Sequence, residues 1–169
     1  VDVVYDGERL SVAVADAPLP VRITGRSGNR LIGEVMAISQ QHDLPVHSHV
    51  LETRTQAVTA QQRYGRTLIE EMRDLGMLTS RLTINHGIWL TRRDIEMLGA
   101  AGCSVSHNPL SNLKLGSGVC PAAELLGRGV RVALGTDGPA ANNDLDVLSE
   151  MRSAGLLAAG VTGRPGAVV

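Results

Sequence analysis

The feature that most constrains the fold is a regular alternation of short apolar runs with longer amphipathic segments. The apolar runs are predicted strands at residues 10–15, 44–50, 81–86, 103–107 and 130–134. The segments between them, in which apolar residues recur at helical spacing, are predicted helices at about 29–42, 55–75, 91–98, 121–129 and 145–159. Because strands that alternate with helices form βαβ units, this pattern predicts an α/β fold with a parallel sheet.

Local signals indicate where several of these helices begin and end. Thr91 followed by Asp94 is close to a capping box, and Gly76 is a plausible end for the long second helix. Pro121 is expected in the first turn of a short helix. Between these helices, residues 108–118 are expected to form a polar loop.

Four successive predicted strands end at or near a residue that can bind a metal or transfer a proton: His49, His86, His107 and Asp137. In a (β/α)8 barrel such strand ends converge on one axis, which favours a barrel over the runner-up arrangement, an open doubly wound sheet. A complete barrel has eight strands and about 250 residues. With 169 residues and these predicted strands, the chain is expected to form part of a TIM-type barrel.

Charge and apolar content exclude several classes of protein. The 16 basic and 17 acidic residues are interspersed, which leaves no electrostatic footprint for nucleic acid or an anionic membrane. No apolar stretch approaches the length that spans a bilayer. Two cysteines, Cys103 and Cys120, do not make a disulfide framework, and we expect reduced thiols and a cytoplasmic protein.

The first candidate site is the HSHVLET segment. His47 and His49 are two residues apart on a predicted strand and therefore face the same side, and Glu52 beyond the strand end can reach the same pocket. Neutral imidazoles suit Zn²⁺ or Fe²⁺, and a nearby carboxylate can move protons to and from water that the metal activates. An isolated His-x-His pair is equally consistent with two hydrogen-bonded core histidines.

Each of the other strand ends also has a structural interpretation. His86 is either an acid–base group or a structural residue, and Trp89 is more typical of packing than of a substrate platform. The segment that begins at His107 and Asn108 either orients a polar heterocycle or satisfies its own backbone. Asp137 either caps a turn or binds a cation that offsets its burial. The structural interpretations weaken together, because all of them must hold at four converging strand ends.

In this order and spacing, the segments HSHVLET, NHGIWL, SHNPLSNLKLGSG and LGTDGPAANN resemble the deaminase branch of the amidohydrolase superfamily. That branch includes deaminases of S-adenosylhomocysteine and methylthioadenosine, guanine and cytosine deaminases, and triazine hydrolases. The resemblance covers about residues 9–159 and implies strands four to eight of the barrel with their helices. Residues 1–169 are therefore expected to be the C-terminal part of such an enzyme.

The resemblance also implies roles for individual residues. It implies one divalent metal, Zn²⁺ in the first place and Fe²⁺ as the alternative, with His49 and Asp137 as its ligands from this chain. The catalytic residues that it implies are Glu52, His86 and Asp137. The substrate-binding residues that it implies are His86, His107, Asn108 and Trp89. The His-x-His pair that supplies two more ligands from strand one of the family does not occur in this chain, and a part for His47 in metal binding is left open.

The function implied is hydrolysis of a C–N bond other than a peptide bond. It is the deamination of an amino-substituted purine, pyrimidine or related N-heterocycle by metal-activated water, with Glu52 as the proton shuttle. Loss of chloride or an alkylamine from a triazine ring needs the same groups and is the alternative within the family. A non-catalytic fragment or binding domain is the alternative from another class, because two ligands are absent. The complete enzyme is expected to be a homo-oligomer, and this chain alone to be inactive.

Overall fold

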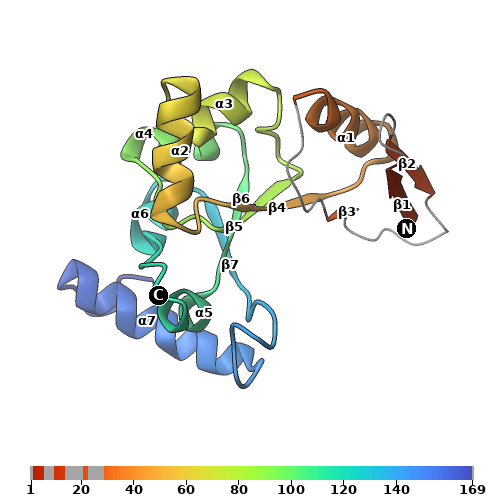
Figure 1. Cartoon of the computed structure of the whole chain (residues 1–169). Helices are drawn as coiled ribbons and strands as arrows, with labels where there is room; N and C mark the ends of the chain where they lie inside the picture. The colour runs from red at the N-terminus through yellow and green to blue at the C-terminus, as the bar shows by residue number, and fades with distance from the viewer. Residues whose placement is uncertain (1, 6–9, 14–20, 23–28, 169) are drawn as a thin grey trace.

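The computed structural model of the chain describes residues 2–5, 10–13, 21–22 and 29–168. Its centre is a parallel sheet in which the strands follow one another in the order β3-β4-β5-β6-β7 (Figure 1). The strands are β3 Val21–Arg22, β4 Val46–Val50, β5 Leu82–His86, β6 Ser104–His107 and β7 Arg131–Leu134. Every neighbouring pair is parallel, which confirms the predicted α/β class with a parallel sheet.

Helices connect the strands. They are α1 Asn29–His42, α2 Arg54–Tyr64, α3 Leu68–Asp74, α4 Arg92–Ala100, α5 Pro109–Lys114, α6 Ala122–Gly127 and α7 Val147–Thr162. In Figure 1, α2, α3, α4 and α6 lie along one side of the sheet, and α7 crosses below it next to α5. Contacts join α7 to α5, α6 and β7. Among the described residues, no helix is both long and apolar enough to cross a membrane.

The two faces of the sheet differ in polarity. One face is apolar and packs against the helices. Its side chains Val46, Leu82, Ile84 and Val105 are completely buried. The opposite face, which we call the inner face, carries a row of polar or small side chains in register: His49, Asn85, Ser106 and Ala133. Parallel sheets are usually apolar on both faces, so the polar inner face indicates a surface that is kept for function.

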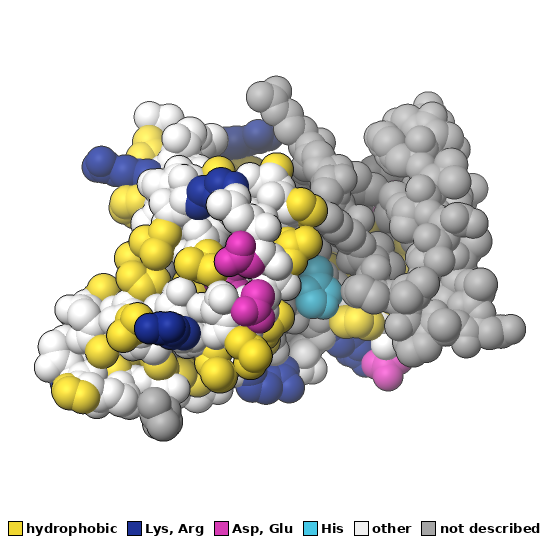
Figure 2. All heavy atoms as spheres, turned by 90° about the horizontal axis from the view of Figure 1, so that it is seen from below, with side chains coloured by type: hydrophobic (Ala, Val, Ile, Leu, Met, Phe, Trp, Pro, Cys, Tyr) yellow, Lys and Arg dark blue, Asp and Glu magenta, His cyan; other side chains and the backbone are white. Residues whose placement is uncertain are grey.

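The outer face of α7 is unusually apolar for a surface. Several of its large side chains are exposed: Val147, Leu148, Met151, Leu156 and Val161. Figure 2, which views the molecule from below, shows apolar side chains gathered on this side. The opposite side of α7 buries Ala154 and Ala158, whose small side chains allow close packing on the rest of the chain.

The prediction that residues 10–15 form the first strand of the parallel sheet is wrong. The structure places β2, Leu10–Ala13, in a separate sheet antiparallel to β1, Asp2–Tyr5, and residues 14–15 lie outside the described residues. The edge beside β4 is taken by β3. Apolar alternation shows that a segment is extended, but pairing also depends on the partner, which the segment itself does not identify.

Two helix predictions are also corrected. The predicted helix 55–75 is two helices, because Gly65 has a left-handed backbone (φ 67°) and Thr67 begins α3 with a capping box. The predicted loop 108–118 contains α5, which begins at Pro109. Proline at the first helical position is favoured, since its missing N–H is not needed there.

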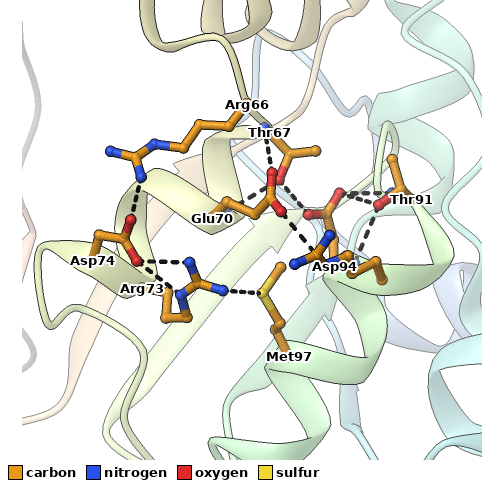
Figure 3. Close-up of polar contacts among 9 residues, drawn as sticks. Arg66, Thr67, Glu70, Arg73, Asp74, Thr91, Asp94 and Met97 are labelled. Atoms are coloured by element: carbon orange, nitrogen blue, oxygen red, sulfur yellow. Dashed lines mark hydrogen bonds and ion pairs between the residues drawn. The ribbon is translucent and has the colours of Figure 1, made fainter.

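The predicted cap at Thr91 is confirmed. Asp94 of this capping box also forms a hydrogen bond to the N-terminus of a second helix (Figure 3). Asp94 is fully buried and accepts hydrogen bonds from the Thr91 amide and hydroxyl, both at 2.8 Å. Its other oxygen accepts from the hydroxyl of Thr67, the N-cap of α3, at 2.5 Å. One buried carboxylate therefore joins the N-termini of α3 and α4.

This connection predicts a large stability loss in Asp94→Ala. The substitution removes the N3 partner of the α4 capping box, which costs about 0.5–2 kcal/mol, and leaves hydroxyl and amide donors without partners, which costs about 1–3 kcal/mol more. We therefore expect urea denaturation to show a loss of about 1.5–5 kcal/mol in the free energy of unfolding. Glu96→Ala removes an exposed carboxylate from the same helix, paired with Arg128, and should cost no more than about 1 kcal/mol. Equal losses in the two variants would show that the buried connection contributes nothing special.

Candidate functional site

Three side chains, positioned by three different strands, meet at the carboxyl edge of the sheet. His49 lies on β4, His86 is the last residue of β5, and Asp137 follows β7. The nearest ligand atoms of these three side chains all lie within 4.8 Å of one another. The rings of His49 and His86 are 5.1 Å apart between centroids. The structure therefore brings together the two predicted metal ligands and one predicted catalytic residue.

Left-handed backbone conformations help to direct these side chains. Leu51, His86 and Asp137 have φ values of 53°, 70° and 62°. By alternation, His86 belongs with Leu82 and Ile84, and its ring is fully buried, yet the ring also lies close to that of His49. A non-glycine residue in this region costs about 1–3 kcal/mol and persists only where the surroundings hold it.

Glu52 lies where β4 turns into α2. The left-handed residue Leu51 reverses the chain after β4, and Thr53 is the N-cap of α2. The main-chain amide of Glu52 donates to the Gln56 side chain at 2.7 Å. This leaves the partly exposed Glu52 carboxylate with its Oε2 3.8 Å from Nε2 of His86. A carboxylate at this distance from the cluster can exchange protons with a molecule bound between them.

Two adjacent residues of α5 hold members of the cluster. Ser111 donates its hydroxyl to Oδ2 of Asp137 at 2.6 Å, and Oδ1 of Asn112 lies 2.8 Å from Nδ1 of His86. The predictions from sequence did not assign these two residues a role. The signal was present, because they belong to the polar segment after His107, but a loop prediction could not show which of its groups point at the site.

The charge state of Asp137 suits a residue that binds a cation. Partial burial alone would raise its pKa. The hydrogen bonds from Ser111 and the Gly138 amide outweigh that effect, together with a smaller electrostatic effect of the neighbouring His86 and His49 rings, so the pKa of Asp137 lies below its usual value. The carboxylate is therefore ionised at neutral pH.

A cleft of about 410 Å³ opens beside the cluster on the inner face. Six of its eight lining residues have polar side chains; the lining consists of His47, His49, Asn85, Ser106, Asn108, Gly135, Asp137 and Gly138. The volume is in the range of small-molecule sites. Alternation along β5 and β6 could have identified Asn85 and Ser106, since they share the inner face with His49.

Asn108 lies at this cleft, but its side chain forms hydrogen bonds to neighbouring residues of the protein. Its side chain is buried, and its amide nitrogen is best placed to donate to the Ser106 hydroxyl and to the carbonyls of His107 and Gly135. A methyl group at Gly135 would meet the Asn108 carboxamide at 2.6 Å, which explains the glycine at this position.

The structure does not bring the other two predicted substrate-binding residues into the cleft lining. His107 is buried on the helix side of β6 and faces a small, largely apolar pocket under α6 and α7. Trp89 is 38% exposed and donates its indole N–H to the Ser117 carbonyl at 3.1 Å. In the described part of the chain, His107 therefore contributes to packing, and Trp89 contributes a hydrogen bond to a neighbouring loop.

The donor set fits a divalent transition metal. Two imidazoles and a carboxylate are ligands that Zn²⁺ and Fe²⁺ accept. Nε2 of His86 is buried and has no hydrogen-bond partner among the described residues, although leaving such an atom unpaired costs about 1–3 kcal/mol. A cation, or a water molecule bound beside one, would satisfy it.

The chain matches a known protein family and is similar to several characterised proteins. Residues 12–167 match the amidohydrolase family. The chain is 44% identical over 127 residues to a 5-methylthioadenosine/S-adenosylhomocysteine deaminase of Thermococcus kodakarensis. That match covers 75% of this chain and 30% of the relative, so the chain spans less than a third of the relative's length.

Solved structures are similar in the same region. The chain resembles an adenosine deaminase from Xanthomonas campestris with bound zinc, with a TM-score of 0.81 and 39% identity over 84% of this chain and 32% of that one. A triazine hydrolase from Arthrobacter aurescens has a TM-score of 0.75 and 25% identity over 81% of this chain and 30% of that one. These similarities confirm that the sheet and its helices are part of a (β/α)8 barrel.

The burial of His107 predicts a pH-dependent loss of stability. Removal from water, with a smaller contribution from charge on His86, lowers the pKa of His107 from 6.5 to about 4. Between these values the unfolded chain binds the proton and the folded chain does not, so stability falls by about 3 kcal/mol as the pH falls through this window.

We expect His107→Leu to lack this loss. The measurement is the change in the free energy of unfolding between about pH 7 and about pH 4.5, which carboxylates affect equally in both proteins. The exposed residue His42 provides a control, since His42→Leu should keep the wild-type change. A loss in His107→Leu as large as in the wild type would mean that the ring is charged in the folded protein.

Proposed function

Because the chain belongs to the amidohydrolase family, we propose that it carries part of the active site of a metal-dependent hydrolase that deaminates an adenine-type nucleoside. The observation that carries this proposal is the meeting of His49, His86 and Asp137 beside a polar cleft. The relatives support the substrate class. Identities of 44% and 39% are with enzymes named for adenosine-type substrates, whereas the triazine hydrolase is 25% identical.

We propose His49 and Asp137 as ligands of the metal from this chain, with zinc as the metal. When bound, Zn²⁺ would lower the pKa of water to about 7 and so make hydroxide available at neutral pH. The zinc in the Xanthomonas structure supports the choice of metal. Ligands from elsewhere in the protein would complete the coordination, since structural and catalytic zinc sites use at least about three protein ligands.

The roles of the other residues follow from their positions. Glu52 takes a proton from the attacking water and gives it to the ring nitrogen of the substrate, for which its partly exposed carboxylate lies close enough to the cluster. His86 presents Nε2 to the same space, 3.8 Å from Glu52 and 4.0 Å from Asp137, and orients the water. Asn85 and Ser106 offer polar groups to the heterocycle from the cleft. The amino group takes the remaining proton of the attacking water and leaves as ammonia when the C–N bond breaks, which leaves a carbonyl group on the ring.

We also propose a setting for this activity. The partner is a small N-heterocyclic molecule, and the enzyme is proposed to be a homo-oligomer. A cytoplasmic location is proposed because Cys103 and Cys120 are both free and buried, as reduced thiols would be. Burial raises the pKa of these thiols to about 11 and about 12, so they are unreactive at neutral pH.

Substitutions should separate the metal ligands from the proton shuttle. In the protein that carries this sequence, we expect His49→Ala and Asp137→Ala to lose both zinc and ammonia release. Glu52→Gln should keep its zinc while kcat falls by about 10²–10⁴, since it removes only proton transfer. Zinc content by mass spectrometry and ammonia release from adenosine, methylthioadenosine and S-adenosylhomocysteine measure the two effects.

The control is His42→Ala, which removes an exposed histidine at the end of α1 and should leave zinc and activity unchanged. Release of zinc from Glu52→Gln would identify Glu52 as a ligand. A zinc-loaded wild type that releases no ammonia from any of the three nucleosides would contradict the deaminase proposal. Chloride release from a chlorotriazine by the same protein would then favour the triazine reaction.

A further inference from the structure

We propose that Ser111 and Asn112 are positioning residues, which hold Asp137 and His86 in the orientations that the metal and its water require. The inference rests on the proposed function and extends it to residues that do not themselves line the cleft. Its physical basis is that two neighbouring side chains of α5 bind two separate members of one cluster.

Ser111 fixes the carboxylate of Asp137. The serine is fully buried, and its hydroxyl donates to Oδ2 of Asp137 at 2.6 Å, a length typical of a hydrogen bond to an ionised acceptor. Asp137 lies after β7 in a left-handed conformation, so the strand alone does not fix its side chain. With Oδ2 engaged, the carboxylate keeps one orientation toward His49 and His86. Hydrogen bonds of this kind to metal ligands typically change metal affinity by about 10–100-fold.

Asn112 fixes the tautomer of His86. Its carbonyl oxygen Oδ1 lies 2.8 Å from Nδ1 of the ring, and both side chains are buried. A carbonyl oxygen can only accept, so Nδ1 must carry the hydrogen, and in the neutral ring Nε2 is then the unprotonated nitrogen. Nε2 is the atom that is buried without a hydrogen-bond partner among the described residues, beside Glu52 and Asp137. Asn112 therefore makes the nitrogen that faces the cluster a lone-pair donor.

The helix that carries both residues is itself tied to the segment after β7. The amide of Leu110 donates to Oε2 of Glu150, a fully buried carboxylate of α7, at 3.0 Å. The other oxygen of Glu150 accepts from the Asn142 side chain. At the far end of α5, Lys114 donates to the Ala140 carbonyl at 3.1 Å. The segment that follows Asp137 is thus attached to both ends of α5, and the helix cannot shift independently of that segment.

A purely structural role would predict a different result from a positioning role. If Ser111 and Asn112 only stabilised the packing of α5, their loss would lower the stability of the folded protein without changing the ring nitrogen that carries hydrogen in His86. A positioning role predicts a change at His86 and in zinc affinity in variants that remain folded.

The test uses Ser111→Ala and Asn112→Leu in the protein that carries this sequence. Zinc affinity is measured by competition with a chelator, and the tautomer of His86 is read from its ring ¹⁵N signals in the zinc-free protein. We expect Ser111→Ala to bind zinc about 10–100-fold more weakly, because Ser111 holds a proposed metal ligand. Wild-type His86 should show the Nδ1–H form, and Asn112→Leu should show a mixture of tautomers.

Two further variants control this test. Asn112→Asp keeps an acceptor oxygen and should retain the Nδ1–H form, and it serves if Asn112→Leu does not fold. Ser117→Ala removes a nearby hydroxyl that makes no side-chain hydrogen bond in the described part of the chain, and it should bind zinc as the wild type does. Thermal unfolding of the zinc-free proteins shows which variants are folded.

Folded Ser111→Ala and Asn112→Leu proteins with wild-type zinc affinity and an unchanged His86 tautomer would overturn the proposal. An Nε2–H form in the wild type would overturn it for Asn112, because the amide nitrogen would then face the ring. A wild type that binds no zinc and releases no ammonia contradicts the proposed function instead. In that case the ¹⁵N signals of the zinc-free protein still decide whether Asn112 controls His86.

Discussion

Parallel pairing of β4, β5, β6 and β7 is the constraint on which the candidate site depends. In a parallel sheet all strands end at the same edge, so side chains far apart in the chain can converge there without any long-range loop. His49 and Asp137 are separated by most of the described chain, yet their ligand atoms lie within 4.8 Å with those of His86. The connecting helices supply the apolar cover, through which Val46, Leu82 and Ile84 are removed from water. The free energy gained by burying the apolar face offsets the cost of placing polar side chains on the inner face.

Left-handed backbone recurs around the cluster. Among the described residues, five that are not glycine have this conformation; Leu51, His86 and Asp137 adjoin the cluster, and Asp43 and Leu145 lie elsewhere. The unpaired Nε2 of His86 belongs to the same pattern, because a buried polar atom without a partner is tolerated where a ligand is expected. Local conformation and unsatisfied polarity thus point to the same small region.

Much of this arrangement could be predicted from the sequence. The runs that became β4 to β7, the cap at Thr91, and the histidines and aspartate at the strand ends were visible because periodicity and capping are local signals. The pairing of β2 was not, since it depends on a second segment. The left-handed φ of His86 was not visible either, because no pattern of residue types reports that angle. Ser111 and Asn112 required α5, whose six residues are too few to establish a helical period.

Attachment of α5 at both ends has a consequence for the energetics of ligand capture. A flexible helix would have to be ordered each time an ion arrived, and that loss of freedom would subtract from affinity. Here Glu150 and Lys114 restrain α5 as the chain folds, so the entropic penalty of arranging Asp137 and His86 falls on folding and not on association. Preorganisation of this kind favours small, charged ligands, which offer little contact area with which to reshape a protein.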